Sequence, residues 1–261
     1  MDETFQTYLN RAVRLILPET QQSQVQHIQE SPKFDRDPVT GYRPRPFPGF
    51  TVITPPGQED RENATFYQQI AQYQQQIMSQ LGDNYFIALP PDSFHLTLAD
   101  LIWDSAYTDA VTQRPDFDHQ LRVNLAETFQ ECHPLTQGKS IPFQVLGLMV
   151  MTRALGICLA PTNEEGYDRI LKLRRAIYQK PAVIGLGIEQ QYYFTPHITL
   201  GYFGKAPTPE EQAGFGDRLA GLNQYWLETE PQTFEVKRAE VRQFTDMTCY
   251  VRQPDWPVLE F

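Results

Sequence analysis

Long apolar runs are missing from this sequence of 261 residues. No stretch approaches the ~18 consecutive apolar residues that a membrane-spanning helix requires, so we expect no contact with a membrane. The first residues, MDETFQTYLNR, are polar and acidic and lack the pattern of a signal or transit peptide. We therefore expect a cytoplasmic protein.

Cysteine is scarce as well. Cys132, Cys158 and Cys249 lie far apart, and none belongs to a CxxC pair. An odd number of widely spaced cysteines favours neither a disulfide framework nor a zinc site. We expect all three to be buried free thiols.

Basic residues are in deficit: 22 Lys and Arg stand against 32 Asp and Glu, for a net charge of −10. Non-specific binding to a long nucleic acid rests on a basic face that neutralises several phosphates, and no dense basic block is present. The charge balance instead favours a small anionic ligand held by a few well-placed groups.

The first 48 residues are rich in Gln and Pro and show weak periodicity, so we interpret them as an extension packed on a core domain of residues 49–261. The clearest periodic segment follows, where one apolar stripe predicts an amphipathic helix over residues 59–81. Its members are Phe66, Ile70, Tyr73, Ile77 and Leu81.

Mixed elements with several hairpins predict an α+β fold built on antiparallel sheets, with one similar lobe from each half of the chain. The predicted helices after 59–81 cover 118–132 and 161–179 and begin again at 208. The predicted strands cover 49–56, 84–89, 94–103, 141–151 and 154–161, a pair within 183–203, and a closing hairpin of 233–244 with 247–253.

One short phrase occurs twice: SFHLTLADLIW covers residues 93–103 and TPHITLGYFG covers 195–204. Side chains two apart on a strand point to the same face, so each phrase pairs a histidine with a threonine. The pairs are His95 with Thr97 and His197 with Thr199. One copy would be weak evidence, but two copies at matching places in the two halves predict a shared site.

Two such pairs suit phosphoryl transfer. An in-line displacement needs one group to take a proton from water and another, on the opposite side of phosphorus, to give one to the leaving oxygen. Imidazole, with an ordinary pKa near ~6.5, serves either role at neutral pH. Hydroxyls between the rings can bind the non-bridging oxygens. We take His197 as the base and His95 as the acid, although the symmetry hardly separates the two roles.

The segments FHLTL and PHITL resemble the two signature motifs of the 2H phosphoesterase superfamily. The resemblance covers residues 49–253, leaving residues 1–48 outside it. It implies a bilobal α+β fold, with pseudo-symmetric lobes around a central cleft, and activity on cyclic phosphates. The segments PFPGFTVI (46–53) and RQFTDMTCYV (242–251) are most similar to a bacterial branch described only as a domain of unknown function.

Further candidates for substrate binding follow from strand parity. Trp103 is expected on the side of His95 and Phe203 on the side of His197, where aromatic rings could stack on a base. Tyr202 has the other parity and would reach the groove only through a twist or bulge. Arg153, at a predicted turn, is a candidate phosphate contact.

A metal site is the main alternative for the histidines. Asp100 follows His95 by five residues and faces away on a straight strand, so it would not complete a ligand set. We expect no metal and no cofactor.

The sequence therefore predicts a monomeric, metal-independent phosphodiesterase that opens 2′,3′-cyclic phosphates on nucleotides or RNA ends. A non-catalytic nucleotide-binding or sensing module and an RNA ligase-like activity remain alternatives.

Overall fold

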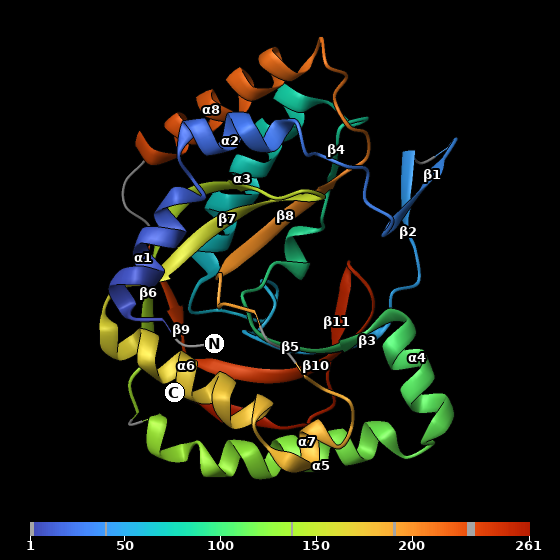
Figure 1. The fold of residues 1–261 in the computed structure, drawn as a ribbon, viewed down its shortest axis with the longest axis vertical. Helices are drawn as coiled ribbons and strands as arrows, with labels where there is room; N and C mark the ends of the chain where they lie inside the picture. The colour runs from blue at the N-terminus through green and yellow to red at the C-terminus, as the bar shows by residue number, and fades with distance from the viewer. Residues whose placement is uncertain (1–2, 40, 137, 190–191, 229–232) are drawn as a thin grey trace.

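Antiparallel strand pairing builds the core of the protein (Figure 1). The computed structural model describes residues 3–39, 41–136, 138–189, 192–228 and 233–261. Within these ranges the strands form one two-stranded and two five-stranded sheets, and their pairings are antiparallel. The predicted α+β class with antiparallel sheets is confirmed.

The two larger sheets each contain one strand of the repeated phrase. The β5 sheet has the order β11-β10-β3-β5, with β12 paired to β10, and the β8 sheet has the order β4-β8-β7-β6-β9. The small sheet is the hairpin of β1 (Phe34–Asp37) and β2 (Gly41–Pro44). The remaining strands are β3 (Gly49–Ile53), β4 (Phe86–Ala88), β5 (Thr97–Trp103), β6 (Ile141–Val150), β7 (Ala154–Pro161), β8 (His197–Phe203), β9 (Thr233–Val236), β10 (Arg238–Asp246), β11 (Cys249–Val251) and β12 (Val258–Glu260).

Helices cover the outer faces of both sheets (Figure 1). Helices α2, α3 and α8 pack on the β8 sheet, and α5, α6 and α7 lie on the far side of the β5 sheet. The helices are α1 (Phe5–Arg14), α2 (Pro18–Val25), α3 (Ala64–Leu81), α4 (Asp104–Gln113), α5 (Phe117–Glu131), α6 (Glu164–Tyr178), α7 (Pro181–Ile184) and α8 (Gln212–Glu228), with 3₁₀ turns η1 (Pro91–Ser93) and η2 (His133–Leu135). None of the helices in the described ranges is long and apolar enough to cross a membrane.

The two lobes exchange strands between the halves of the chain. Strand β4, from the first half, pairs with β8, and β10, from the second half, pairs with β3. The predicted strand 233–244 accordingly divides at Lys237 into β9 and β10, which belong to different sheets. Each lobe therefore needs both halves of the chain to complete its sheet.

The apolar stripe predicted for residues 59–81 is buried on α3, although the helix begins at Ala64. One helix was not predicted, and one predicted strand was wrong. Helix α4 was missed because Tyr107 is its one buried residue and leaves no periodic stripe. Of the strand pair predicted within 183–203, β8 is present, but residues 183 and 184 belong to the short helix α7, since a short apolar run does not distinguish strand from helix.

The cysteine prediction holds for two residues of three. Cys132 and Cys158 are buried free thiols, whereas Cys249 is exposed on β11. Edge strand β11 is exposed along much of its length, so the thiol points outward.

The first helix is anchored in the core. Tyr8 on α1 is fully buried, stacks on Tyr167 with ring centroids 4.5 Å apart, and donates a hydrogen bond to the carbonyl of Leu159 at 3.4 Å. Helix α1 thereby contacts both α6 and β7.

We predict that Tyr8→Ala lowers the free energy of unfolding by about 3–5 kcal/mol, the usual cost of emptying a large aromatic site in a core. Val13→Ala, on the exposed side of the same helix, should change it by less than about 0.5 kcal/mol. Denaturant titrations of both variants make the measurement. Equal effects would show that α1 is not part of the cooperative core.

Candidate functional site

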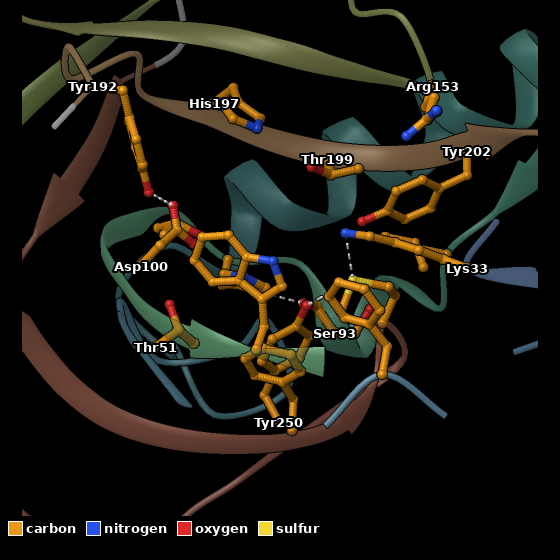
Figure 2. Close-up of a pocket in the computed structure, with 17 residues that line it drawn as sticks. Lys33, Thr51, Ser93, Asp100, Arg153, Tyr192, His197, Thr199, Tyr202 and Tyr250 are labelled. Atoms are coloured by element: carbon orange, nitrogen blue, oxygen red, sulfur yellow. Dashed lines mark hydrogen bonds between the residues drawn. The ribbon is translucent and has the colours of Figure 1, made fainter. Parts of the chain in front are cut away.

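A pocket of about 530 Å³ is lined by residues of both larger sheets (Figure 2). From β5 and the residues before it come His95, Thr97, Asp100 and Trp103. From β8 come His197, Thr199 and Tyr202. The remaining described lining residues are Lys33, Phe47, Thr51, Leu89, Ser93, Arg153, Tyr192, Phe244, Met247 and Tyr250.

The two histidines are held by the same kind of hydrogen bond, from Nδ1 to the backbone carbonyl two residues earlier. Nδ1 of His95 lies 2.8 Å from the carbonyl oxygen of Ser93, and Nδ1 of His197 lies 2.8 Å from that of Thr195. A carbonyl oxygen can only accept, so each Nδ1 carries a proton and donates it. Each ring therefore offers Nε2 to the pocket, as a base when the ring is neutral and as an acid when it is charged.

Bulges decide which later residues of each strand face the pocket. Leu98 and Leu101 on β5 have no partner position on β3, and Leu200 on β8 has none on β7. Each bulge inserts a residue and shifts the strand's alternation by one. Pocket-facing residues on β5 consequently recur every three positions, at Thr97, Asp100 and Trp103.

The same shift explains the placement of three residues and corrects the expectation for two of them, Phe203 and Asp100. Tyr202 faces the pocket through the bulge at Leu200. Phe203 does not: it is fully buried and packs against Phe215 of α8, so it is not available to a substrate. Asp100 lines the pocket instead of facing away, because β5 is not straight.

The predicted histidine and threonine residues are thus brought together with Trp103, Tyr202 and Arg153. The roles assigned to these seven residues stay predictions. Among the described residues, no group of three His, Cys, Asp or Glu side chains is arranged to hold a metal ion.

Burial makes both imidazoles hard to charge in the free protein. Desolvation lowers the pKa of His95 to about 4, and the nearby charges of His197 and Arg242 act in the same direction. Desolvation also lowers the pKa of His197, but there the Asp100 carboxylate opposes the shift. Among the groups that shift the two pKa values, a carboxylate favours the charged form of His197, whereas none does so for His95.

Charged groups divide between the two ends of the pocket (Figure 2). At one end the Tyr192 hydroxyl donates a short hydrogen bond to the Asp100 carboxylate. At the other end lie Lys33 and Arg153, with Tyr202 beside them. His197 and Thr199 lie between these ends.

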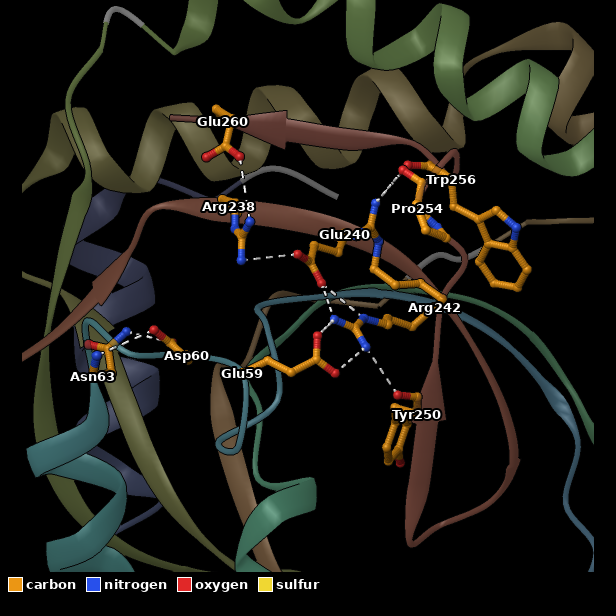
Figure 3. A network of polar contacts seen from close by, with 11 residues as sticks. Glu59, Asp60, Asn63, Arg238, Glu240, Arg242, Tyr250, Pro254, Trp256 and Glu260 are labelled. Atoms are coloured by element: carbon orange, nitrogen blue, oxygen red, sulfur yellow. Dashed lines mark hydrogen bonds and ion pairs between the residues drawn. The ribbon is translucent and has the colours of Figure 1, made fainter.

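A buried charge network contacts the backbone of Tyr250, a residue of the pocket wall (Figure 3). The Arg242 guanidinium, 2% exposed, donates to the Glu240 carboxylate, 1% exposed, and to Glu59. It also donates to the backbone carbonyl of Tyr250 at 3.2 Å. The Tyr250 ring lies against the His95 ring with centroids 4.2 Å apart. Arg242 therefore holds the strand whose side chain packs on His95.

The N-terminal helix supports the other histidine. Arg11 of α1 donates to the hydroxyl of Thr195 and to the carbonyl of Phe194, both at 2.8 Å. Glu3 pairs with the same guanidinium. Because the Thr195 carbonyl accepts the Nδ1 hydrogen of His197, α1 helps to fix the segment that orients that ring.

A family comparison agrees with this site. Residues 33–133 match the family model 2H-phosphodiest, "Domain of unknown function (DUF1868)", and the matched region includes His95 and Thr97. This match supports the resemblance of the chain to the 2H phosphoesterase superfamily over the first of the two motifs. The match begins at Lys33, inside the segment that we predicted to be an extension, and ends before the second histidine. No curated protein sequence matches the chain.

Solved structures provide a comparison of the fold. A conserved protein of unknown function, ATU0111 from Agrobacterium tumefaciens, shares 16% sequence identity over 85% of this chain and 90% of that one, with a TM-score of 0.55. Weaker likenesses are E. coli LigT complexed with 3′-AMP (14%, 76% and 88%, TM-score 0.39) and Kluyveromyces marxianus Usb1 (12%, 82% and 97%, TM-score 0.43). Of these three, the Agrobacterium protein is similar enough to show a shared fold.

Sequence reasoning missed several residues of this site. Lys33 lies in a Gln- and Pro-rich segment without periodicity, and Tyr250 and Arg242 lie in a hairpin with no catalytic spacing. For Tyr250, the similarity of RQFTDMTCYV to one branch of the superfamily was a usable signal. Arg242 is the first residue of the same segment, but its burial could not be predicted, because a buried arginine is indistinguishable in sequence from an exposed one.

We predict that Arg242→Met lowers the free energy of unfolding by about 3–5 kcal/mol, because it leaves the Glu240 carboxylate buried without its main partner. Adding Glu240→Gln to this variant should recover part of the loss, since the unpaired charge is then removed. Arg238→Met, at a more exposed arginine of the same network, should cost at most about 1 kcal/mol. Additive losses in the double variant would contradict the proposed coupling.

Proposed function

We propose that this protein is a phosphodiesterase that opens 2′,3′-cyclic phosphates of nucleotides or RNA ends, without a metal ion. One observation carries the proposal: two imidazoles whose Nδ1 hydrogens are bound to backbone carbonyls offer Nε2 to one pocket, each with a threonine two residues later. The family match supports phosphodiesterase chemistry in general. The cyclic phosphate as substrate is our inference.

The reaction requires one proton to leave and one to arrive. A water molecule attacks phosphorus and gives its proton to one neutral imidazole at Nε2. The bond from phosphorus to one ribose oxygen breaks, and the other, charged imidazole gives that oxygen its Nε2 proton. Thr97 and Thr199 donate hydrogen bonds to the non-bridging oxygens, where negative charge increases in the transition state.

The charges around the rings favour His95 as base and His197 as acid, the reverse of our expectation from the sequence. Asp100 favours the charged form of His197 and outweighs the opposing charge of Lys33. Arg242 disfavours the charged form of His95, and no carboxylate in the described part of the chain offsets it. A base must be neutral and an acid charged when the reaction begins.

The pocket matches the size of a small ligand. Its volume of about 530 Å³ lies in the ordinary range for ligand sites. The rings of Trp103, Tyr202 and Tyr250 in its wall can pack against a base. The net charge of −10 favours a short substrate over a long nucleic acid.

We expect His95→Ala and His197→Ala each to lower kcat for adenosine 2′,3′-cyclic phosphate by roughly 10²- to 10⁴-fold, the usual contribution of one general acid or base. Thr97→Val and Thr199→Val should each cost roughly 10- to 100-fold through a lost hydrogen bond to a charged group. His119→Ala, at an exposed histidine on α5, is the control and should act as wild type.

The same assays, run with EDTA, distinguish the alternatives. Full activity in EDTA is expected, and complete loss would overturn metal independence. Binding of the cyclic phosphate without turnover would favour a sensing module, and joining of RNA ends would favour a ligase-like activity. If the His95→Ala and His197→Ala variants keep the wild-type kcat, the proposal is wrong.

The pH dependence follows from the two lowered pKa values. The His95 base is neutral above about pH 4, and the His197 acid loses its proton as the pH rises through a pKa below its ordinary 6.5. We expect a bell-shaped profile of kcat/KM whose acidic limb comes from His95 and whose alkaline limb comes from His197. Bound phosphate favours imidazolium, so the alkaline limb of kcat should lie at higher pH.

The histidine variants assign the limbs. His95→Ala should remove the acidic limb and His197→Ala the alkaline limb. The opposite pattern would restore the assignment expected from the sequence. A flat wild-type profile from pH 4 to 8 would contradict acid–base catalysis by these residues.

A further inference from the structure

The pocket continues into a second groove of about 690 Å³ on the side of Lys33 and Arg153. The two cavities share Lys33, Arg153, His197, Thr199 and Tyr202. The groove is lined by residues of the segment 29–33 and of the adjacent turn 151–154 between β6 and β7. A substrate held between the histidines therefore has room to extend past Lys33.

The segment 29–33 is held to the β8 sheet by backbone hydrogen bonds. The amide of Gln29 donates to the carbonyl of Thr152 at 2.7 Å, and that of Ser31 to the carbonyl of Phe203 at 2.8 Å. The Arg153 guanidinium donates to the Gln29 side chain at 3.0 Å. Lys33 and Arg153 thus lie at the junction of the cavities, on two segments that are hydrogen-bonded to each other.

The Lys33 ammonium lies among soft and aromatic groups. Its Nζ is 3.2 Å from the sulfur of Met247, 4.5 Å from the ring centroid of Phe47 and 5.2 Å from that of Tyr202. Aromatic faces attract a cation but do not neutralise it. The position of the ammonium is therefore defined by packing and not by a counter-ion.

Among the described residues, no carboxylate lies within ion-pair distance of Lys33. Asp100 and Asp104 act on it only from a distance, and Arg153 adds a like charge. Desolvation lowers the pKa of Lys33 to about 8. A partly buried cation without a partner is costly, and an anionic ligand would remove the cost.

We infer that the junction of the two cavities is an anion subsite in which Lys33, assisted by Arg153, binds a second phosphate group of the substrate. The inference rests on the proposed function and narrows its substrate class to cyclic phosphates that carry another phosphate, such as a 5′-phosphorylated nucleotide or an RNA end. Asp100, at the opposite end, repels an anion and so favours this orientation (Figure 2).

A paired-substrate assay tests the subsite. Adenosine 2′,3′-cyclic phosphate and its 5′-phosphorylated form are compared on wild type, Lys33→Met and Arg153→Met, with Lys172→Met on the exposed side of α6 as the control. We expect wild type to prefer the 5′-phosphorylated substrate about ten-fold or more in kcat/KM, mainly through KM. The substrate without a 5′-phosphate cannot form the charged hydrogen bond with Lys33.

The variants should remove this preference to different extents. Lys33→Met should abolish this preference, mainly by raising the KM of the 5′-phosphorylated substrate. Arg153→Met should reduce the preference only about two- to five-fold, because Arg153 is exposed and screened. Lys172→Met should behave as wild type. A Lys33→Met variant with equally lowered kcat on both substrates would place Lys33 at the reacting phosphate and overturn the inference.

Equilibrium binding separates this inference from the proposed function. Adenosine 3′,5′-bisphosphate and adenosine 3′-phosphate are titrated by calorimetry on the same variants. If wild type prefers the bisphosphate about ten-fold or more and Lys33→Met does not, the subsite stands even without turnover of any cyclic phosphate, and only the proposed function fails. If cyclic phosphates are hydrolysed but neither preference is seen, the subsite fails alone.

Discussion

Two hydrogen bonds, from the Nδ1 atoms of His95 and His197 to the backbone carbonyls two residues earlier, determine what this site can do. They fix the tautomer of both rings and leave the same nitrogen of each free for the pocket. The two rings are therefore chemically equivalent until their surroundings differ. Asp100 near His197 and Arg242 near His95 supply that difference, and in the proposed reaction these two charges would set which ring gives a proton and which takes one.

Backbone irregularity determines the rest of the pocket wall. On a straight strand, alternation would place Asp100 and Tyr202 on the apolar faces of their sheets. The extra residues Leu98 and Leu200 turn these side chains toward the pocket and leave Phe203 in the core. A polar or aromatic side chain is thereby added three residues after each threonine. Both strands carry a bulge directly after the threonine, but the side chain turned into the pocket is an aspartate on β5 and a tyrosine on β8.

The fold class, the stripe of α3 and the histidine and threonine pairs could be predicted, since each depends on a local period or a repeated phrase. The error about Phe203 and Asp100 has one cause: strand parity is reliable only up to the first bulge, and a bulge leaves no clear mark in a sequence. Lys33 and Arg242 could not be found because their importance comes from burial and long-range packing. The division of 233–244 between two sheets also depends on tertiary pairing, which a continuous β pattern hides.

Arg11 joins the start of the chain to a segment almost two hundred residues later, through the hydroxyl of Thr195 and the carbonyl of Phe194. One of these contacts is to the backbone and is indifferent to the residue type there, but the other depends on a hydroxyl. During divergence, residue 195 and residue 11 are consequently not free to vary independently. Related sequences that have lost Arg11 should carry a different residue before the second histidine motif, so the N-terminal segment and that motif are expected to evolve as one unit.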